Sequence, residues 1–233
     1  MYIVTPTEIP FVVWQGNLIA HTGRLIPTSS LPPVAALGQA DVWPIEAVLE
    51  TAPGQWTPPE PDTEYWLLRQ GVQLFQHAPI SNILEAQLTL YLRMPHDPKA
   101  SLVYAHSLFP TLMNPEQPVE TDIGLRTDLS FVGESGIDET QPHARITYRQ
   151  VFPTLRGYGE GKCAPYWIFK PAGARALEGC QYVYLVAAIP SEAAQAEVEM
   201  LTELIVTINT LRGPLRFGLP SEARARARVR IPR

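Results

Sequence analysis

Two stretches of the chain have the pattern of apolar positions that is typical of β-strands. From Cys180 to Ile189 the sequence is almost continuously apolar, and aromatic and β-branched residues dominate its first half. Such a run predicts a strand that is covered on both faces. From Ile83 to Met94 apolar and polar residues alternate, which predicts a half-buried strand with one face in water.

The segment after Ile189 has the pattern of a helix. Pro190 ends the preceding strand, and Ser191 stands at an N-cap position. Apolar residues then recur at spacings of four and three, as on one helical face: Ala194, Val198, Leu201, Ile205 and Ile208. We therefore expect one amphipathic helix over about residues 191–212. The β-branched residues between 204 and 210 leave a strand as the alternative.

The end of the chain alternates most regularly. Between Ala223 and Ile231, apolar residues stand between four arginines, which are Arg224, Arg226, Arg228 and Arg230. A strand would gather these arginines on one face, whereas a helix would scatter them around its circumference. We therefore expect a C-terminal strand with one basic face.

Together these elements predict a mainly β fold. Turn signals separate roughly seven to ten strand-forming runs. We expect an antiparallel β-sandwich or jelly-roll-like sheet, with the helix of about residues 191–212 packed on it, and an α+β fold is the alternative. The length suits a single domain, 1–233, with an irregular N-terminal segment at 1–63. The 24 prolines are scattered, which indicates many loops and sharp strand ends rather than a linker.

Charge is distributed unevenly along the chain. The net charge is −5, yet residues 212–233 hold seven arginines and one acid. This asymmetry is compatible with a tail that binds nucleic acid, and equally with a basic strand docked on an acidic surface of the same chain or of a neighbouring copy. Arginines two apart on a strand are roughly 6.6–6.8 Å apart, close to twice the ~3.4 Å rise between phosphates. An edge strand protected by its charges is the plainer explanation.

A turn rich in glycine precedes the last third of the chain. Its notable residues are Gly157, Gly159, Gly161 and Lys162. A phosphate-binding loop would need glycine where Arg156 stands and serine or threonine where Cys163 stands. A strand is expected after it, so no helix N-terminus would face a ligand. We interpret the turn as a mobile hairpin loop.

The sequence contains no recognisable catalytic or metal-binding motif. Cys163 and Cys180 are too few for a disulfide framework, and the five histidines never occur as HxH, HxxxH or HExxH. We therefore expect neither a metal nor a cofactor. Cys163 follows Lys162 and is the best candidate for a nucleophile if the fold brings His143 beside it, although lone cysteines near strands commonly serve packing.

The leading interpretation is a non-catalytic, β-rich binding or assembly protein. Its basic C-terminal strand would contact a protein partner or another copy of the chain. The first alternative is a nucleic-acid-binding subunit that contacts phosphates through the Arg224–Arg230 face, and the second is an enzyme whose site forms only in the fold. The N-terminus lacks the basic segment of a signal peptide, and the longest apolar run is far shorter than the ~20 residues of a membrane helix. We expect a cytoplasmic protein without membrane contact.

Overall fold

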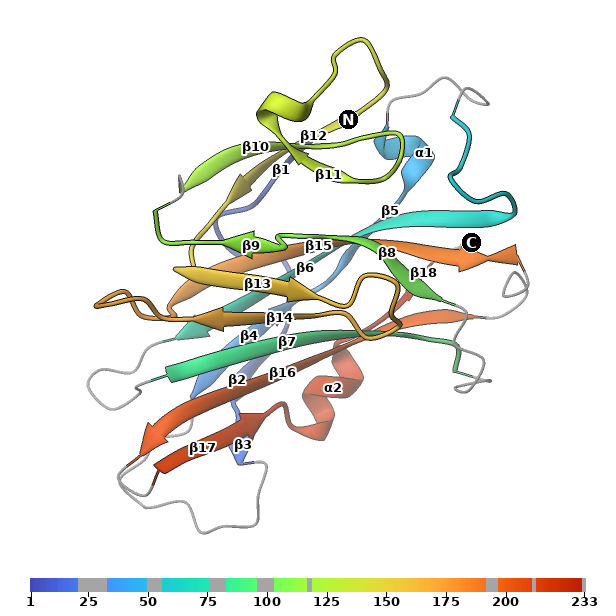
Figure 1. The fold of residues 1–233 in the computed structure, drawn as a ribbon. Helices are drawn as coiled ribbons and strands as arrows, with labels where there is room; N and C mark the ends of the chain where they lie inside the picture. Colours follow the sequence, from blue (N-terminus) through green and yellow to red (C-terminus); the bar gives the residue numbers. More distant parts are fainter. Residues whose placement is uncertain are drawn as a thin grey trace.

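The molecule consists mostly of β-strands in three sheets (Figure 1). The computed structural model describes residues 1–20, 33–49, 56–75, 83–95, 103–116, 119–191, 197–210 and 213–231. Within these ranges the helical elements are short: α1 (Ile45–Val48), α2 (Ser221–Arg226) and the 3-10 helix η1 (Glu134–Gly136). The predicted mainly β, antiparallel and sandwich-like fold is confirmed.

Each sheet combines strands from distant parts of the chain. The four-stranded sheet has the order β1 (Tyr2–Val4), β12 (Ala144–Arg149), β10 (Glu120–Leu125) and β11 (Phe131–Gly133). The six-stranded sheet has the order β2 (Val12–Asn17), β4 (Val34–Gly38), β6 (Thr63–Phe75), β15 (Gly179–Pro190) and β8 (Tyr104–Phe109), and β5 (Asp41–Pro44) also pairs with β6. The eight-stranded sheet has the order β3 (Ile19–Ala20), β17 (Gly213–Gly218), β16 (Val198–Thr210), β7 (Ile83–Arg93), β14 (Tyr166–Lys170), β13 (Thr154–Tyr158) and β9 (Leu112–Met113), and β18 (Arg228–Ile231) also pairs with β16.

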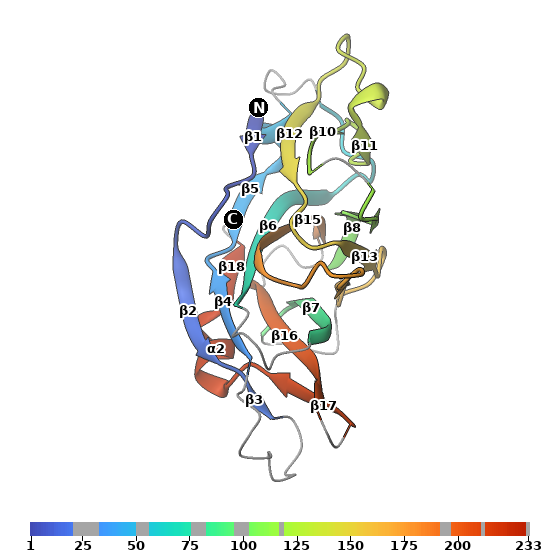
Figure 2. The same cartoon turned by 90° about the vertical axis from the view of Figure 1, so that its left-hand side faces the viewer.

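The six-stranded and eight-stranded sheets form two layers, and the four-stranded sheet lies at one end of them (Figures 1 and 2). Fully buried aromatic side chains, among them Trp167 and Phe169, fill the core. A hydrogen bond from the Thr202 hydroxyl on β16 to the side-chain oxygen of Gln70 on β6 joins the two layers at 3.0 Å. Described ladders are antiparallel except that of β1 with β12, which is parallel.

The predictions of the two strands with the clearest sequence patterns are confirmed. The apolar run from Cys180 to Ile189 forms most of β15, which lies between β6 and β8 and is buried along nearly its whole length. The alternating run from Ile83 to Met94 forms β7, between β14 and β16. Central positions in their sheets explain why these strands have the strongest apolar patterns.

The predicted helix over residues 191–212 is wrong where the structure describes this segment, because residues 198–210 form β16. Residues 192–196 and 211–212 lie outside the described residues. Along β16 the buried residues include every second position, from Val198 to Ile208. The ladder with β7 pairs Glu199 with Arg93 and continues to Ile208 with Ile83. Val198, Leu204 and Ile208 would suit a helix as well as a strand. The edge of β7 offers unpaired backbone groups, and hydrogen bonds to them stabilise the strand.

The predicted strand over Ala223–Ile231 is correct only at its end. Residues 221–226 form α2, and residues 228–231 form β18, which pairs with the start of β16. Pro220 precedes the first turn in an extended conformation, and alanine, glutamate and arginine all favour helix. The methyl group of Ala223 is buried, so packing against the body stabilises this short helix despite the alternating sequence.

The N-terminal segment is more regular than its sequence predicts. The described part of residues 1–63 contains β1 to β5 and α1, so the expectation of an irregular segment is wrong there. β1, β2 and β3 each occupy the outer edge of a different sheet in the strand orders above. Edge strands have only one neighbour, which explains their short length and weak apolar patterns. Among the described helices, none has the length and apolar character needed to cross a membrane.

Candidate functional site

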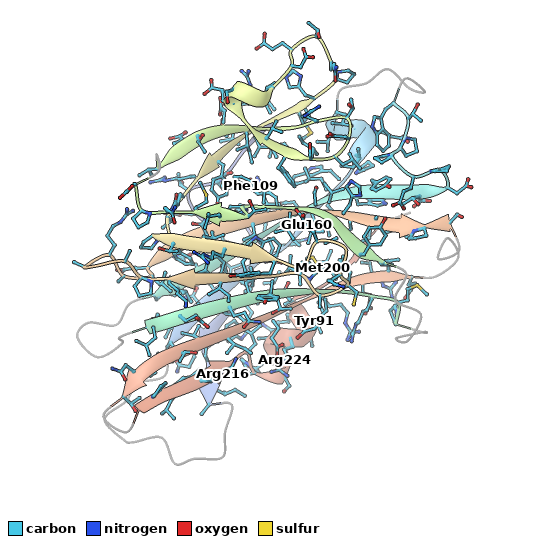
Figure 3. All side chains as sticks on the ribbon, viewed as in Figure 1. Tyr91, Phe109, Glu160, Met200, Arg216 and Arg224 are labelled. Carbon is cyan, nitrogen blue, oxygen red and sulfur yellow. The ribbon has the colours of Figure 1, made fainter. Side chains whose placement is uncertain are left out.

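The four C-terminal arginines do not form the single row that their sequence spacing predicts. Arg224 and Arg226 lie on α2, whereas Arg228 and Arg230 lie on β18. Figure 3 shows Arg224 beside Tyr91 of β7, at the outer surface of the eight-stranded sheet. Because the first pair lies on a helix and the second on a strand, the regular spacing that would follow a phosphate backbone is absent.

Three of these arginines bind carboxylates of their own chain. Arg224 lies 3.1 Å from Glu203, and Arg230 lies 3.1 Å from Glu197. Arg228 lies 3.6 Å from Glu199. The acids belong to β16 or directly precede it, so the basic end of the chain docks on an acidic surface of the same molecule. This arrangement is one of the alternatives that the charge distribution left open.

Glu199 explains why the basic end is needed at this place. Its side chain is only 5% exposed, and it also lies 3.4 Å from the guanidinium of Arg93. A buried carboxylate is costly unless opposite charges and hydrogen bonds compensate it. Arg228 therefore stabilises the sheet by compensating the buried charge of Glu199.

Arg226 differs from the other three arginines. It is exposed, and within the described ranges it has no ion pair or side-chain hydrogen bond. It lines a groove of about 350 Å³ together with Arg228, Arg230 and the neighbouring residues Val13 and Gln39. The described residues that line this basic groove include no acid.

The glycine-rich turn lies between β13 and β14 and is bonded to its neighbours. The Gly161 amide donates to the Ala105 carbonyl at 2.7 Å, and the Ala105 amide donates to the Lys162 carbonyl at 3.0 Å. Gly159 and Gly161 have positive φ values of 99° and 71°, which glycine adopts without strain. The mobility expected for Gly157, Gly159, Gly161 and Lys162 stays a prediction, and these hydrogen bonds favour an anchored turn.

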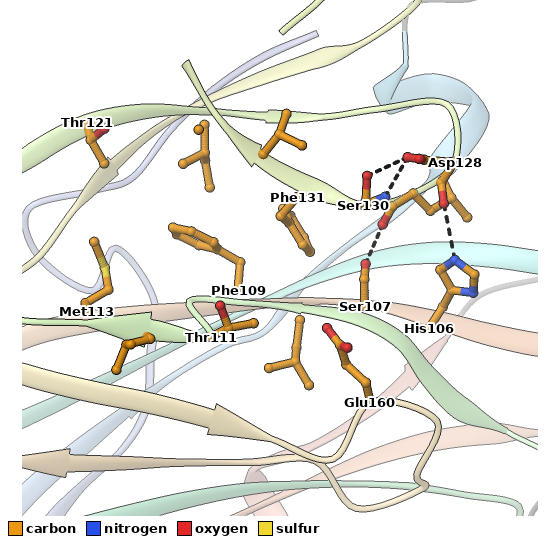
Figure 4. A pocket seen from close by; sticks show the side chains of 16 residues that line it. His106, Ser107, Phe109, Thr111, Met113, Thr121, Asp128, Ser130, Phe131 and Glu160 are labelled. Atoms are coloured by element: carbon orange, nitrogen blue, oxygen red, sulfur yellow. Dashed lines mark hydrogen bonds between the residues drawn. The ribbon is translucent and has the colours of Figure 1, made fainter. Parts of the chain in front are cut away.

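On the opposite side from the basic groove lies a cleft of about 480 Å³, bounded by β8, β9, β10 and β11 (Figure 4). The rings of Phe109 and Phe131 lie 5.7 Å apart within it. Glu160, from the glycine-rich turn, points toward it from below. Among the described residues that line it, Asp128 and Glu160 are the acids, and none is a lysine or an arginine. The cleft is therefore aromatic and acidic.

Asp128 supplies a stable negative charge at the rim of this cleft. The Ser130 hydroxyl and amide donate to its carboxylate at 2.6 and 3.1 Å. Burial by itself would raise the pKa of Asp128, but these hydrogen bonds and the nearby charge of Arg126 outweigh burial and lower it. The carboxylate is therefore ionised at neutral pH.

Serine, histidine and aspartate meet in the cleft without forming a nucleophile–base pair. The Ser130 hydroxyl donates to Asp128, and the Ser107 hydroxyl donates to the Leu129 carbonyl. The His106 ring bonds the Asp128 backbone carbonyl at 3.3 Å rather than a hydroxyl. A serine nucleophile requires a hydrogen bond to its base, so this geometry does not favour hydrolysis by Ser107 or Ser130.

The candidate pair of Cys163 and His143, which depended on the fold bringing the two residues together, does not form among the described contacts. Cys163 is exposed in the turn between β13 and β14, whereas His143 directly precedes β12 and bonds the Gln141 carbonyl. Among the described residues, groups of three or more His, Cys, Asp or Glu placed to hold a metal ion are absent.

The two thiols should differ clearly in reactivity. Burial raises the pKa of Cys180 to about 11, so its thiolate is scarce at neutral pH and reagents reach it poorly. With Ellman's reagent at pH 8, Cys163 is expected to react first, and Cys180 only after unfolding. Cys163→Ser should remove the early phase, and Cys180→Ser should keep it. Simultaneous reaction of both thiols in the folded protein would contradict this assignment.

The N-terminal edge is defined as β1, β2 and β3 with their connections. Its strand β2 lies on the opposite side of the molecule from β8 and β11, two of the strands that bound the cleft (Figure 2). Its exposed apolar side chains are Tyr2, Val4, Phe11, Val12 and Ile19. Residues 1–20 contain one charged side chain, Glu8. Edge strands are normally protected by charged residues or by a covering element, and this edge has few charges among its described residues.

Hydrogen bonds hold the N-terminal edge against the body. The Arg69 guanidinium donates to the Val4 carbonyl at 3.0 Å, and the Tyr182 hydroxyl donates to the Glu8 carbonyl at 3.0 Å. The hydroxyls of Thr5 and Tyr184 lie 2.7 Å apart in the core. The exposed residues are therefore presented on an ordered strand. Neither this edge nor the cleft was predicted from the sequence. The small number of charged residues in 1–20, where Glu8 is the one charged side chain, was the available signal for the edge.

Comparison with known proteins finds no protein family model and no curated protein that matches this chain. Solved structures with a similar arrangement include a "Pore forming protein", with 8% identity and a TM-score of 0.38 over 86% of this chain and 92% of that one. Another is the delta-toxin of Clostridium perfringens, with 6% identity and a TM-score of 0.35 over 88% of this chain and 90% of the toxin. These values assign the chain to no family.

Proposed function

We propose that the protein is a non-catalytic assembly protein that associates with other copies of itself. The N-terminal edge and basic groove of one copy would contact the cleft of the next. The observation that carries the proposal is the N-terminal edge, where three sheets end in exposed apolar side chains and Glu8 is the one charged side chain of residues 1–20. Exposed apolar side chains on edge strands that few charges protect commonly mark a protein contact.

The two surfaces are complementary in charge. Among the described residues, the basic groove is lined by three arginines and no acid, and Arg226 is the one of the three without a carboxylate partner in the same chain. The described lining of the cleft includes two acids and no lysine or arginine. α2 and β18 lie on the same side of the molecule as β2, and β8 and β11 lie on the other side (Figure 2). Contact between two different surfaces is head-to-tail, and repetition of such a contact builds a ring or a filament.

The nucleic-acid alternative has less support. It rested on four arginines in one row of a strand, and three of the four bind carboxylates of this chain instead. Arg226 is the one of the four without a carboxylate partner among the described residues. One unpaired arginine gives far fewer phosphate contacts than the four that were expected. We therefore favour a protein partner, and a second copy in particular.

Sedimentation velocity at several protein concentrations tests the proposal. We expect a concentration-dependent oligomer at low salt that weakens as salt rises, because part of the contact is electrostatic. The double variant Val4→Lys/Phe11→Lys should weaken association about tenfold or more, since charges on an edge strand oppose pairing and Phe11 loses its apolar contact.

Leu84→Lys is the matched control. Leu84 is also an exposed apolar strand residue, but it lies on β7 within the eight-stranded sheet. It should leave association unchanged. A wild-type protein that stays monomeric at every concentration and ionic strength would refute the proposed function.

A further inference from the structure

We infer that Arg226 of one copy inserts its guanidinium into the cleft of the next copy, beside Glu160 and the rings of Phe109 and Phe131. This inference rests on the proposed self-association and names the residues of its electrostatic contact. It differs from the interpretation of the sequence, in which all four C-terminal arginines would contact the partner.

The four C-terminal arginines differ in whether a carboxylate of their own chain lies beside them. Arg224, Arg228 and Arg230 each lie within 3.1–3.6 Å of a carboxylate of their own chain. Arg226 is exposed at the end of α2 and has no such partner among the described residues. α2 stands at the outer boundary of this side (Figure 2), so its last turn can reach a neighbouring molecule.

Among the described residues, the cleft combines an unpaired carboxylate with aromatic side chains. Glu160 is exposed, and no described group of its own chain makes an ion pair or side-chain hydrogen bond with it. It lies at the cleft that Phe109 and Phe131 line (Figure 4). A guanidinium stacks on aromatic faces and pairs with carboxylates, and it sheds water more readily than an ammonium ion. The cleft therefore suits an arginine better than a lysine.

Glu160 lies on a turn whose backbone is hydrogen-bonded to β8. Gly159 and Gly161 flank it, and backbone hydrogen bonds tie the turn to β8 through Ala105. This anchoring restrains the backbone on either side of Glu160 before any partner arrives, which lowers the entropy cost of binding. The glycine-rich turn would then present its own carboxylate, that of Glu160, to a partner rather than bind a phosphate.

A charge-reversal cycle tests the contact. Arg226→Glu and Glu160→Arg should each weaken self-association about tenfold or more, because each places like charges in contact. The double variant Arg226→Glu/Glu160→Arg should recover most of the loss, since the pair is restored with its charges exchanged. Neither side chain has a partner within the described part of its own chain, so circular dichroism should show an unchanged fold.

Arg216→Glu and Glu178→Arg are the matched controls, because both residues are exposed and line neither the basic groove nor the cleft. Each should have a smaller effect than the corresponding reversal at Arg226 or Glu160. Wild-type oligomers with single variants that associate normally, or with a double variant that shows no recovery, would overturn the Arg226–Glu160 contact and leave self-association standing. A monomeric wild-type protein would overturn both.

Discussion

Replacement of Gln181 by leucine should lower the free energy of unfolding by about 2–6 kcal/mol, because two backbone donors lose their acceptor at about 1–3 kcal/mol each. The Gln181 side chain on β15 is fully buried. Its oxygen accepts hydrogen bonds from the amides of Val151 and Phe152 at 2.9 and 3.0 Å. Its nitrogen donates to the Tyr148 hydroxyl at 2.6 Å.

These bonds connect the four-stranded sheet to the rest of the molecule. Tyr148 belongs to β12, and Val151 and Phe152 follow that strand. Leucine has nearly the same volume as glutamine but can accept no hydrogen bond, so the amides would be left unpaired inside the protein. We therefore expect the contact between β12 and β15 to loosen first.

Urea unfolding followed by circular dichroism measures this effect. Gln141→Leu is the matched control, because Gln141 is exposed in the loop before β12 and surface substitutions usually change stability by about 0.5 kcal/mol or less. A midpoint for Gln181→Leu equal to that of the wild type would show that the buried hydrogen bonds do not stabilise the junction.

Replacement of Gly157 by alanine should destabilise the protein by about 3 kcal/mol, near the upper end for an overpacked core. A methyl group at this position would lie 2.5 Å from the Leu108 side chain, 2.5 Å from the Pro110 carbonyl oxygen and 2.9 Å from the Trp167 ring nitrogen. The carbonyl oxygen belongs to the backbone and accepts a hydrogen bond from Trp167 at 3.0 Å. It cannot move aside without breaking that bond.

Gly133→Ala separates this steric effect from a general effect of replacing glycine. Gly133 has a φ of −68°, and a methyl group there would meet no atom within 4 Å. Alanine should therefore be neutral or slightly stabilising at this position. Comparable unfolding midpoints for Gly157→Ala and Gly133→Ala would contradict the close packing of β13 against β8.

The Gly157 variant also distinguishes two roles of the glycine-rich turn. The sequence indicates glycines that give mobility, whereas Gly157 lies within β13 and is surrounded by other side chains and backbone. Its small size is needed because the chain between β8 and β9 passes very close to it. Only the tertiary structure reveals this requirement, since Leu108 and Pro110 are distant in sequence.

The cleft, too, could not be predicted from the sequence, because its residues are distant along the chain. Its residues come from three separate regions, around Phe109, around Phe131 and at Glu160. No local pattern unites them, because pairing within and between sheets brings them together. The basic end of the chain was visible from composition, but its ion pairs depend on Glu199 and Glu203 of β16, which the sequence placed on a helix.

The sequence by itself determined the mainly β class and the strands β7 and β15, because alternation and continuous apolar runs are local signals of how a strand is covered. The tertiary structure alone decided between helix and strand for β16 and α2. Residues 198–208 suit either conformation, and the free edge of β7 supplies the hydrogen bonds that select the strand. Residues 221–226 form α2 because the buried methyl group of Ala223 and the contact of Arg224 with Glu203 stabilise a turn of helix against the body.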